Sequence, residues 1–195
     1  MLFAHPALQK SRVNRKLIRY VIDIEGVTVH DLYEAYPDFH IDVVHEQALL
    51  VKNEIIIFHY PVFWFSTPAI LKEWMDLVLQ HGWAYGREGT ALRGKKMLSV
   101  ISTGGRESLY RKGGYHRHTI REFLNPIRQT AALCGMEYLP PFVVHGTHTI
   151  TEQEIARHGE DYRDVITALR DGLLDSETAH TLPRLNSDLK SIIKK

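Results

Sequence analysis

A buried strand followed directly by an amphipathic helix constrains the fold of this chain most strongly. The strand begins at Ile55–Phe58, a fully apolar run that is typical of a parallel strand buried on both faces. Pro61 ends it, because proline supplies no N–H to the sheet ladder. Apolar residues then recur at helical spacing, at Ile70, Leu71, Trp74, Met75 and Val78. Ser66 or Thr67 can cap this helix, with Pro68 at its first position.

The alternation of strand and helix continues along the chain. Thr151 and Glu154 fit a capping box at the start of a last helix. Strands that alternate with helices predict an α/β protein with a parallel sheet and right-handed crossovers. We expect strands at residues 1–4, 27–32, 54–60, 96–103 and 142–145, helices at 12–22, 45–51, 68–81, 119–133 and 151–174, and a loop at 31–39.

Length and composition restrict the class of protein. At 195 residues the chain fits one domain, which we place at 1–195 with a polar tail at 175–195 that is loose or docks on a partner subunit. The 24 basic and 23 acidic residues nearly cancel, so no nucleic-acid partner is expected. The single cysteine, Cys134, excludes an internal disulfide and favours the cytoplasm. We expect a soluble protein, because no apolar run has transmembrane length.

The loop after the first strand offers donors for an anion. It contains no GxGxxG pattern, so it is not expected to hold a Rossmann-type dinucleotide. Ser11 offers a hydroxyl, His5 a ring donor, and Arg12, Val13 and Asn14 backbone N–H groups. A helix start with free N–H groups suits a terminal phosphate. The alternative is structural: Ser11 is a simple N-cap and His5 an ordinary loop residue.

Two further loops follow strand ends, where ligands of open α/β sheets bind. The first is aromatic and can line a planar ligand through Pro61, Val62, Phe63, Trp64 and Phe65. The alternative is that its aromatic side chains are ordinary core residues.

The second loop begins with Thr103, Gly104 and Gly105, and glycines there let backbone N–H groups approach a ligand without a Cβ in the way. Tyr110 and His116 follow, and histidine titrates near neutral pH, which suits proton exchange. The alternative is a solvated basic loop, because arginines and a lysine surround the pair.

Paired histidines at 116/118 and 145/148 suggest a metal only weakly, because no cysteine or carboxylate cluster completes a usual ligand set. We therefore expect no metal site. Arginines in the same basic loop can match the 2′-phosphate of NADPH, but the sequence does not decide between NADH and NADPH.

The run PVFWFSTPAILKEWMDLVLQHGWAYG, the AHP of the first loop and the TGG after the fourth strand resemble the flavin-dependent NAD(P)H:quinone reductase family over residues 4–145. This DT-diaphorase-like family includes ancillary subunits of glutathione-regulated potassium efflux systems, which the segment DLYEAYPDFHID resembles in particular. The resemblance implies a flavodoxin-like three-layer sandwich with a five-stranded parallel sheet in the order 2-1-3-4-5.

The resemblance also implies a function. FMN, or alternatively FAD, would be held by its phosphate in the first loop and by its ring at the other two. NAD(P)H would be the co-substrate and a quinone-like compound the acceptor in a ping-pong reaction, with Tyr110 and His116 assisting hydride transfer. Relatives are homodimers, which places Trp74, Trp83 and Tyr85 near an interface. The alternatives are a regulatory subunit that docks on a membrane potassium efflux antiporter, with reductase activity secondary, and a scaffold without a cofactor.

Overall fold

The fold is built around one parallel sheet. The computed structural model describes residues 1–194. Within them the sheet has six strands, in the order β2-β1-β3-β4-β5 with β6 also paired to β4. The strands are β1 (Leu2–Phe3), β2 (His30–Asp31), β3 (Ile55–Pro61), β4 (Lys96–Ser102), β5 (Glu137–Tyr138) and β6 (Phe142–Val144). The expected α/β class and strand order are confirmed, and the sheet has one strand more than expected.

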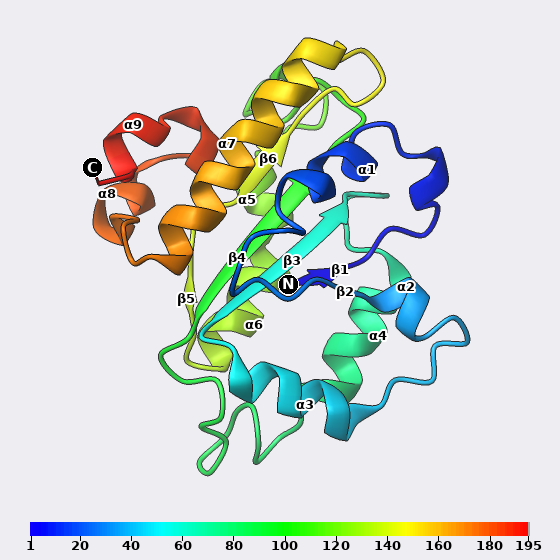
Figure 1. Ribbon diagram of the computed structural model, residues 1–195, viewed down its shortest axis with the longest axis vertical. Helices are drawn as coiled ribbons and strands as arrows, with labels where there is room; N and C mark the ends of the chain where they lie inside the picture. The colour runs from blue at the N-terminus through cyan, green and yellow to red at the C-terminus, as the bar shows by residue number, and fades with distance from the viewer. Residues whose placement is uncertain (195) are drawn as a thin grey trace.

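Helices cover both faces of this sheet, as Figure 1 shows. On one face lie α1 (Asn14–Leu17) and α7 (Glu152–Arg170), and on the other α3 (Val43–Lys52), α4 (Ala69–Val78) and α6 (Asn125–Leu133). The shorter elements are α2 (Leu32–Ala35), α5 (Ile120–Phe123), α8 (Ser176–Thr181), α9 (Leu189–Ile192) and the 3-10 helices η1 (Leu8–Lys10), η2 (Ile18–Tyr20), η3 (Glu107–Leu109) and η4 (Leu185–Ser187). The arrangement is the expected three-layer sandwich.

The central strand β3 is packed from both sides because its successive side chains point to opposite faces. Phe58 meets Trp74 of α4 edge-on, with ring centroids 5.7 Å apart. On the other face His59 meets Tyr162 of α7 edge-on at 5.4 Å. Burial of one large apolar side chain contributes roughly 1.5–3 kcal/mol, so this packing holds the carboxyl end of β3 firmly in place.

The strand expected at 142–145 is joined by β5, which the sequence analysis missed. Glu137 of β5 and Phe142 of β6 both pair with β4, opposite Lys96 and Val100. The two prolines at 140–141 lie between the strands. Proline has no N–H to donate to the sheet, so the extended segment that pairs with β4 is interrupted and forms two short strands.

The segment expected to be a loop at 31–39 contains the short helix α2. Asp31 caps it, because its carboxylate accepts the N–H groups of Tyr33 at 3.0 Å and Glu34 at 3.4 Å. The preceding strand is shorter than expected and contains only His30–Asp31. Aspartate at an N-cap is a local signal that the sequence analysis did not use.

Other helix ends differ in smaller ways. The helix expected at 12–22 is α1 followed by η2, and the helix expected at 119–133 is split into α5 and α6. Pro68 is the residue before α4, and neither Ser66 nor Thr67 caps that helix, because no side chain caps it. The capping box of Thr151 and Glu154 at the start of α7 is confirmed.

The tail at 175–194 is folded against the rest of the chain. The side chains of Leu185 and Ile192 are 0% exposed. Asn186 makes two hydrogen bonds with the backbone of Val143 in β6, accepting its N–H at 3.0 Å and donating to its carbonyl at 2.8 Å. The expectation of a loose tail is therefore wrong: the segment covers the open edge of the sheet beside α7 (Figure 1).

No helix in residues 1–194 combines the length and the apolar character needed to cross a membrane.

Candidate functional site

A cavity of about 890 Å³ opens at the carboxyl ends of β1, β3 and β4. Cavities of this size are typical of small-molecule sites. It is lined by His5, Ala7, Lys10, Ser11, Arg12, Val13, Asn14, Pro61, Val62, Phe63, Trp64, Phe65, Ser102, Gly104, Gly105, Tyr110, His116, Thr147 and His148. The three predicted loops therefore meet at one place. Thr103 is the predicted binding residue that does not line the cavity.

The first loop presents donors to the cavity. The Ser11 hydroxyl oxygen accepts two hydrogen bonds from Asn14, one from the backbone N–H at 3.1 Å and one from the side-chain amide at 3.2 Å. Among the hydrogen bonds of residues 1–194, none uses the backbone N–H of Arg12 or Val13. Because unpaired N–H groups need an acceptor, this loop can bind an anion.

His5 adds a further donor. It is 7% exposed, and its Nδ1 accepts the N–H of Ala7 at 3.1 Å. Burial lowers the pKa of His5, with a smaller opposing effect from a backbone hydrogen bond, so the ring is neutral at pH 7. A neutral ring whose Nδ1 is an acceptor carries its proton on Nε2, which is then available to a ligand.

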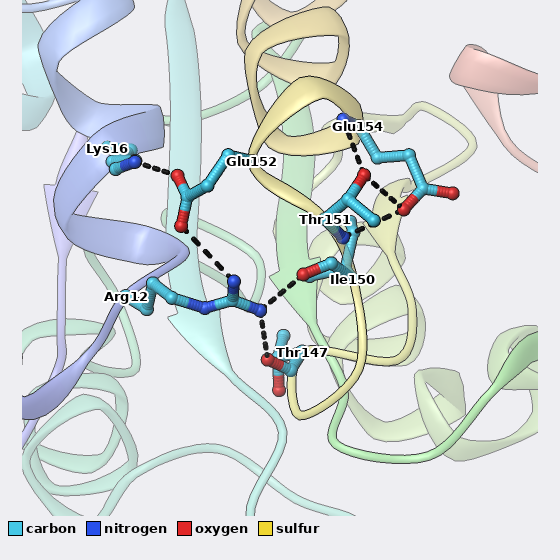
Figure 2. A network of polar contacts seen from close by, with 7 residues as sticks. All are labelled: Arg12, Lys16, Thr147, Ile150, Thr151, Glu152 and Glu154. Atoms are coloured by element: carbon cyan, nitrogen blue, oxygen red, sulfur yellow. Dashed lines mark hydrogen bonds and ion pairs between the residues drawn. The ribbon is translucent and has the colours of Figure 1, made fainter.

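The Arg12 side chain points toward the loop before α7, as Figure 2 shows. Its guanidinium donates to the backbone carbonyls of Thr147 at 3.5 Å and of Ile150, and it pairs with Glu152 at 3.2 Å. Lys16 pairs with the same carboxylate. The Arg12 side chain therefore ties the start of α1 to the loop before α7, which also contributes Thr147 to the cavity lining.

That loop supplies Thr147 and His148, which line the cavity and which the sequence analysis considered only as part of a histidine pair. A Cβ on Gly104 would lie 2.6 Å from Nε2 of the exposed His148 side chain, so that side chain would have to shift. A Cβ on Gly105 would lie 3.1 Å from Cε2 of Tyr110. The signal available in the sequence was the position of His148, four residues after the last strand at the same edge of the sheet.

Tyr110 lies between two histidine rings. Its ring centroid is 4.7 Å from that of His116 and 5.4 Å from that of His145. Thr103 donates its hydroxyl proton to the carbonyl of Gly105 at 2.9 Å, so it accepts from Nδ1–H of His145 at 2.9 Å. Burial lowers the pKa of His145 to about 4, which keeps this ring neutral. Thr103 thus links the backbone of Gly105, in the loop before Tyr110, to the ring of His145.

The aromatic loop makes a tight turn. Phe63 and Ser66 exchange backbone hydrogen bonds of 3.2 and 3.0 Å. The two residues between them, Trp64 and Phe65, have φ values of 48° and 64°. Positive φ is unfavourable for large side chains, so this turn stores backbone strain beside the cavity. Phe65 stacks on Phe123 at 4.9 Å, whereas Trp64 is 94% exposed.

Trp74, which was expected near an interface, is buried in the core. It is 1% exposed, and its indole N–H donates to the carboxylate of Glu46 at 2.8 Å. Its place in the core follows from the helical spacing that predicted α4. Trp74 is therefore a core residue, whereas Trp83 and Tyr85 are half-buried.

Within the described part of the chain, no group of three or more histidine, cysteine, aspartate or glutamate side chains is placed to hold a metal ion.

Comparison with known proteins identifies the family. Residues 1–166 match the family described as Flavodoxin-like fold. A glutathione-regulated potassium-efflux system ancillary protein of Serratia proteamaculans is 46% identical over 164 residues, which is 84% of this chain and 90% of that protein.

Two solved structures are also similar. General stress protein 14 of Treponema denticola, in complex with FMN, has a TM-score of 0.82 and 37% identity over 86% of this chain and 97% of its own. An NADPH-quinone reductase from P. pentosaceus has a TM-score of 0.77 and 32% identity over 84% of this chain and 94% of its own. The chain belongs to the flavodoxin-like fold family, and the resemblance inferred from its sequence is confirmed.

Proposed function

We propose that this protein is a flavin-dependent NAD(P)H:quinone oxidoreductase with FMN as its cofactor. The observation that carries the proposal is the division of the cavity into an end lined by hydrogen-bond donors and an end lined by aromatic rings and glycines. Bound FMN would accept a hydride from NAD(P)H and, in a ping-pong reaction, pass two electrons to a quinone-like acceptor. The FMN complex and the NADPH-quinone reductase among the similar structures support this assignment.

The residues at the donor end fit a phosphate. Arg12 and Val13 offer backbone N–H groups without a protein acceptor, and His5 offers Nε2–H. The Ser11 hydroxyl oxygen already accepts two hydrogen bonds, so its own proton remains for a ligand. A terminal phosphate accepts several such bonds at once, and charge-assisted bonds are about twice as strong as neutral ones. FMN, which ends in this group, is therefore preferred to FAD.

The residues at the aromatic end fit a ring. Gly104 and Gly105 have no Cβ to hinder the close approach of a ligand to the backbone, and a Cβ at either position would press against the side chains of His148 or Tyr110. Tyr110 holds a hydroxyl donor beside them, and His116 lies against its ring. We assign to Tyr110 a hydrogen bond that stabilises negative charge as hydride arrives, and to His116 the supply of a proton.

A titration followed by a reduction tests the function. Purified protein mixed with FMN is expected to bind it at a ratio of about one and to show a shifted visible spectrum. Anaerobic addition of NADPH or NADH then bleaches that spectrum, and benzoquinone restores it. FAD in place of FMN serves as the comparison. A protein that stays colourless after FMN is added, and that reduces no quinone, contradicts the proposal.

A second function is favoured by the 46% identical relative, which is an ancillary protein of a potassium-efflux system. In that case the protein docks on a membrane antiporter, and any reductase activity is secondary. Co-purification with a co-expressed antiporter, together with the absence of quinone turnover, would support this function. Transport assays with a variant that binds no FMN would show whether the two functions are coupled.

We also propose a homodimer, with Trp83 and Tyr85 as candidate contact residues because both are half-buried. Light scattering of the eluting protein measures the assembly, since a monomer has a mass of 22.5 kDa. A homogeneous peak of the monomer mass at every concentration contradicts this proposal.

A further inference from the structure

A buried chain of hydrogen bonds runs from α7 through the sheet to the donor end of the cavity. Tyr162 of α7 lies 3.2 Å from Nδ1 of His59 in β3. Nε2 of the same ring lies 3.3 Å from the side-chain oxygen of Asn14. The Asn14 amide nitrogen then donates to Ser11 at 3.2 Å and to Ser102 at 2.9 Å. Residues from four elements (α7, β3, α1 and β4) and from the loop that carries Ser11 thus form one continuous chain.

His59 and Tyr162 cannot exchange a partner for water, and Asn14, which lines the cavity, is almost fully buried. The side chains of His59 and Tyr162 are 0% exposed, and Asn14 is 2% exposed. Buried polar groups that lose a partner cost about 1–3 kcal/mol, so the direction of each bond depends on its neighbours. Each group in the chain therefore fixes which way the next group donates its proton, from Tyr162 in α7 to the serines at the cavity.

Tyr162 sets that direction. Its hydroxyl lies 3.2 Å from Nδ1 of His59 and 3.3 Å from the sulfur of Met1. A thioether is a weak acceptor, so the hydroxyl proton goes to Nδ1 of His59. The neutral ring then carries its own proton on Nε2 and donates it to the oxygen of Asn14. Burial lowers the pKa of His59 to about 3, which keeps the ring neutral.

The orientation of the Asn14 amide follows. With its oxygen toward His59, both amide protons point to serine oxygens, one on Ser11 and one on Ser102. Ser11 also accepts the backbone N–H of Asn14 at 3.1 Å, which occupies its second acceptor position. Both serines line the cavity, and each keeps one hydroxyl proton to donate there. If the amide were rotated by half a turn, its oxygen would face the serines and accept their hydroxyl protons, which would then not be available to a ligand.

We propose that His59 and Tyr162 are positioning residues that determine the specificity of this site for a phosphate group. They hold the Asn14 amide in the one orientation that makes Ser11 and Ser102 donors to the cavity. Such a site favours a ligand that only accepts hydrogen bonds, as a phosphate dianion does, over a hydroxyl of the same shape. The inference rests on the proposed function, because FMN is the phosphate-bearing ligand.

Affinities for FMN and riboflavin, measured by quenching of flavin fluorescence, test the inference because riboflavin lacks the phosphate. Tyr162→Phe keeps the shape of the core and removes only the hydroxyl. It is expected to weaken FMN binding about three- to tenfold, the equivalent of one neutral hydrogen bond, and to leave riboflavin binding within about twofold. His59→Leu is expected to act in the same direction, and circular dichroism verifies that each variant is folded.

Tyr138→Phe is the matched control. Tyr138 also donates to a serine, Ser99, at 2.9 Å, but neither residue lines the cavity. Its loss removes an internal hydrogen bond without touching the chain to Asn14. Both flavin affinities are expected to stay at the wild-type value.

The His59 tautomer is a readout that needs no cofactor. Nitrogen-15 NMR of the wild-type protein is expected to show a neutral ring protonated on Nε2, and Tyr162→Phe to show a mixture of tautomers. A wild-type ring protonated on Nδ1 overturns the inference, because the chain then runs in the opposite direction. Equal losses of FMN and riboflavin affinity in Tyr162→Phe also overturn it.

The outcomes for this inference and for the proposed function are separable. Wild-type protein that binds FMN and riboflavin equally well refutes the phosphate specificity and leaves flavin binding intact. Wild-type protein that binds no flavin refutes the proposed function. The inference is then decided by inorganic phosphate, titrated against the backbone resonances of residues 11–14: weaker binding to Tyr162→Phe supports it, and no binding to wild type refutes it.

Discussion

At the scale of single residues, the most unusual feature is the pair of large side chains at positive φ in the aromatic turn. Trp64 has a φ of 48° and is 94% exposed, so burial of its side chain does not offset the energetic cost of its backbone conformation. Strain of this kind persists where surrounding contacts hold it, and it is common beside ligand sites. Here Phe65, which stacks on Phe123, provides the holding contact.

Trp64→Gly is therefore expected to stabilise the protein by about 1 kcal/mol, because glycine adopts positive φ without strain. Urea unfolding curves measure the change. Trp64→Ala is the control, since it removes the same indole and keeps a Cβ at the strained position. If alanine stabilises the protein as much as glycine does, backbone strain is not the cause.

Tyr110 and His116 carry a kinetic prediction. Tyr110→Phe combined with His116→Ala is expected to slow flavin reduction by NAD(P)H roughly a hundredfold while flavin content stays intact, because both proposed donors are lost. Stopped-flow single-turnover traces measure this rate. Tyr115→Phe is the control, since this ring is 85% exposed and does not line the cavity. Unchanged reduction in the double variant would contradict the roles assigned to the pair.

At the scale of elements, the buried carboxylate of Glu46 connects α3, α4 and β2. Glu46 of α3 is 1% exposed and receives hydrogen bonds from Tyr36 at 2.5 Å and from Trp74 of α4 at 2.8 Å, while His30 of β2 lies 2.7 Å away. Burial alone would raise the pKa of Glu46, but these hydrogen bonds outweigh it and lower the pKa below its ordinary value. The group thus binds the 31–42 segment to the helices beneath it.

Glu46→Gln is expected to cost about 2–3 kcal/mol of unfolding free energy at pH 7, because bonds to a charged acceptor are lost. Since the folded-state pKa is lowered, the contribution of Glu46 is present above its unfolded pKa of about 4.3 and disappears as pH falls through the folded value. Urea unfolding at pH 7, 5 and 3.5 should show the two proteins converging in acid.

The exposed pair Lys72 and Asp76 on α4 provides a control for the Glu46 prediction. Both side chains are more than half exposed, at 60% and 55%. Asp76→Asn is expected to cost less than about 0.5 kcal/mol, because water screens the charges. A loss as large as that of Glu46→Gln would mean that burial does not decide the strength of these contacts.

At the scale of the whole molecule, the C-terminal segment completes the sheet edge. It lies beyond residue 166, where the match to the family ends. Its contacts are nevertheless internal: Leu185 is buried, and Arg184 pairs with Glu107 at the start of the loop that carries Tyr110. The segment therefore supports one rim of the cavity as well as the edge strand β6.

Leu185→Ala is expected to cost about 2–4 kcal/mol of unfolding free energy, because it leaves a cavity in a fully buried contact. Thermal and urea unfolding measure the loss. Leu133→Ala is the matched control, since Leu133 is 58% exposed and its truncation should cost less than about 0.5 kcal/mol. Equal costs would show that the tail is not packed as described.

The residues alone were sufficient for the α/β class with a parallel sheet and for the three loops around the cavity, whereas the strand order was implied by the resemblance to a known family. Short-range patterns carried the information on the class and the loops: the apolar run of β3 and the helical spacing of α4 are local, and the carboxyl ends of parallel strands must meet at one edge. For the same reason the residues from Ser11 to Asn14, the aromatic turn and the glycines after β4 could be grouped before any contact was known.

Tertiary structure decided the rest, because the partners are far apart in the chain. The Arg12 side chain bonds to carbonyls more than 130 positions away, and Tyr162 reaches His59 across 103 positions. Packing also decided that Trp74 is a core residue, that Glu46 is buried and that the polar tail folds onto β6. Such contacts leave no periodic pattern in the sequence, since they depend on which surfaces the packed elements bring together.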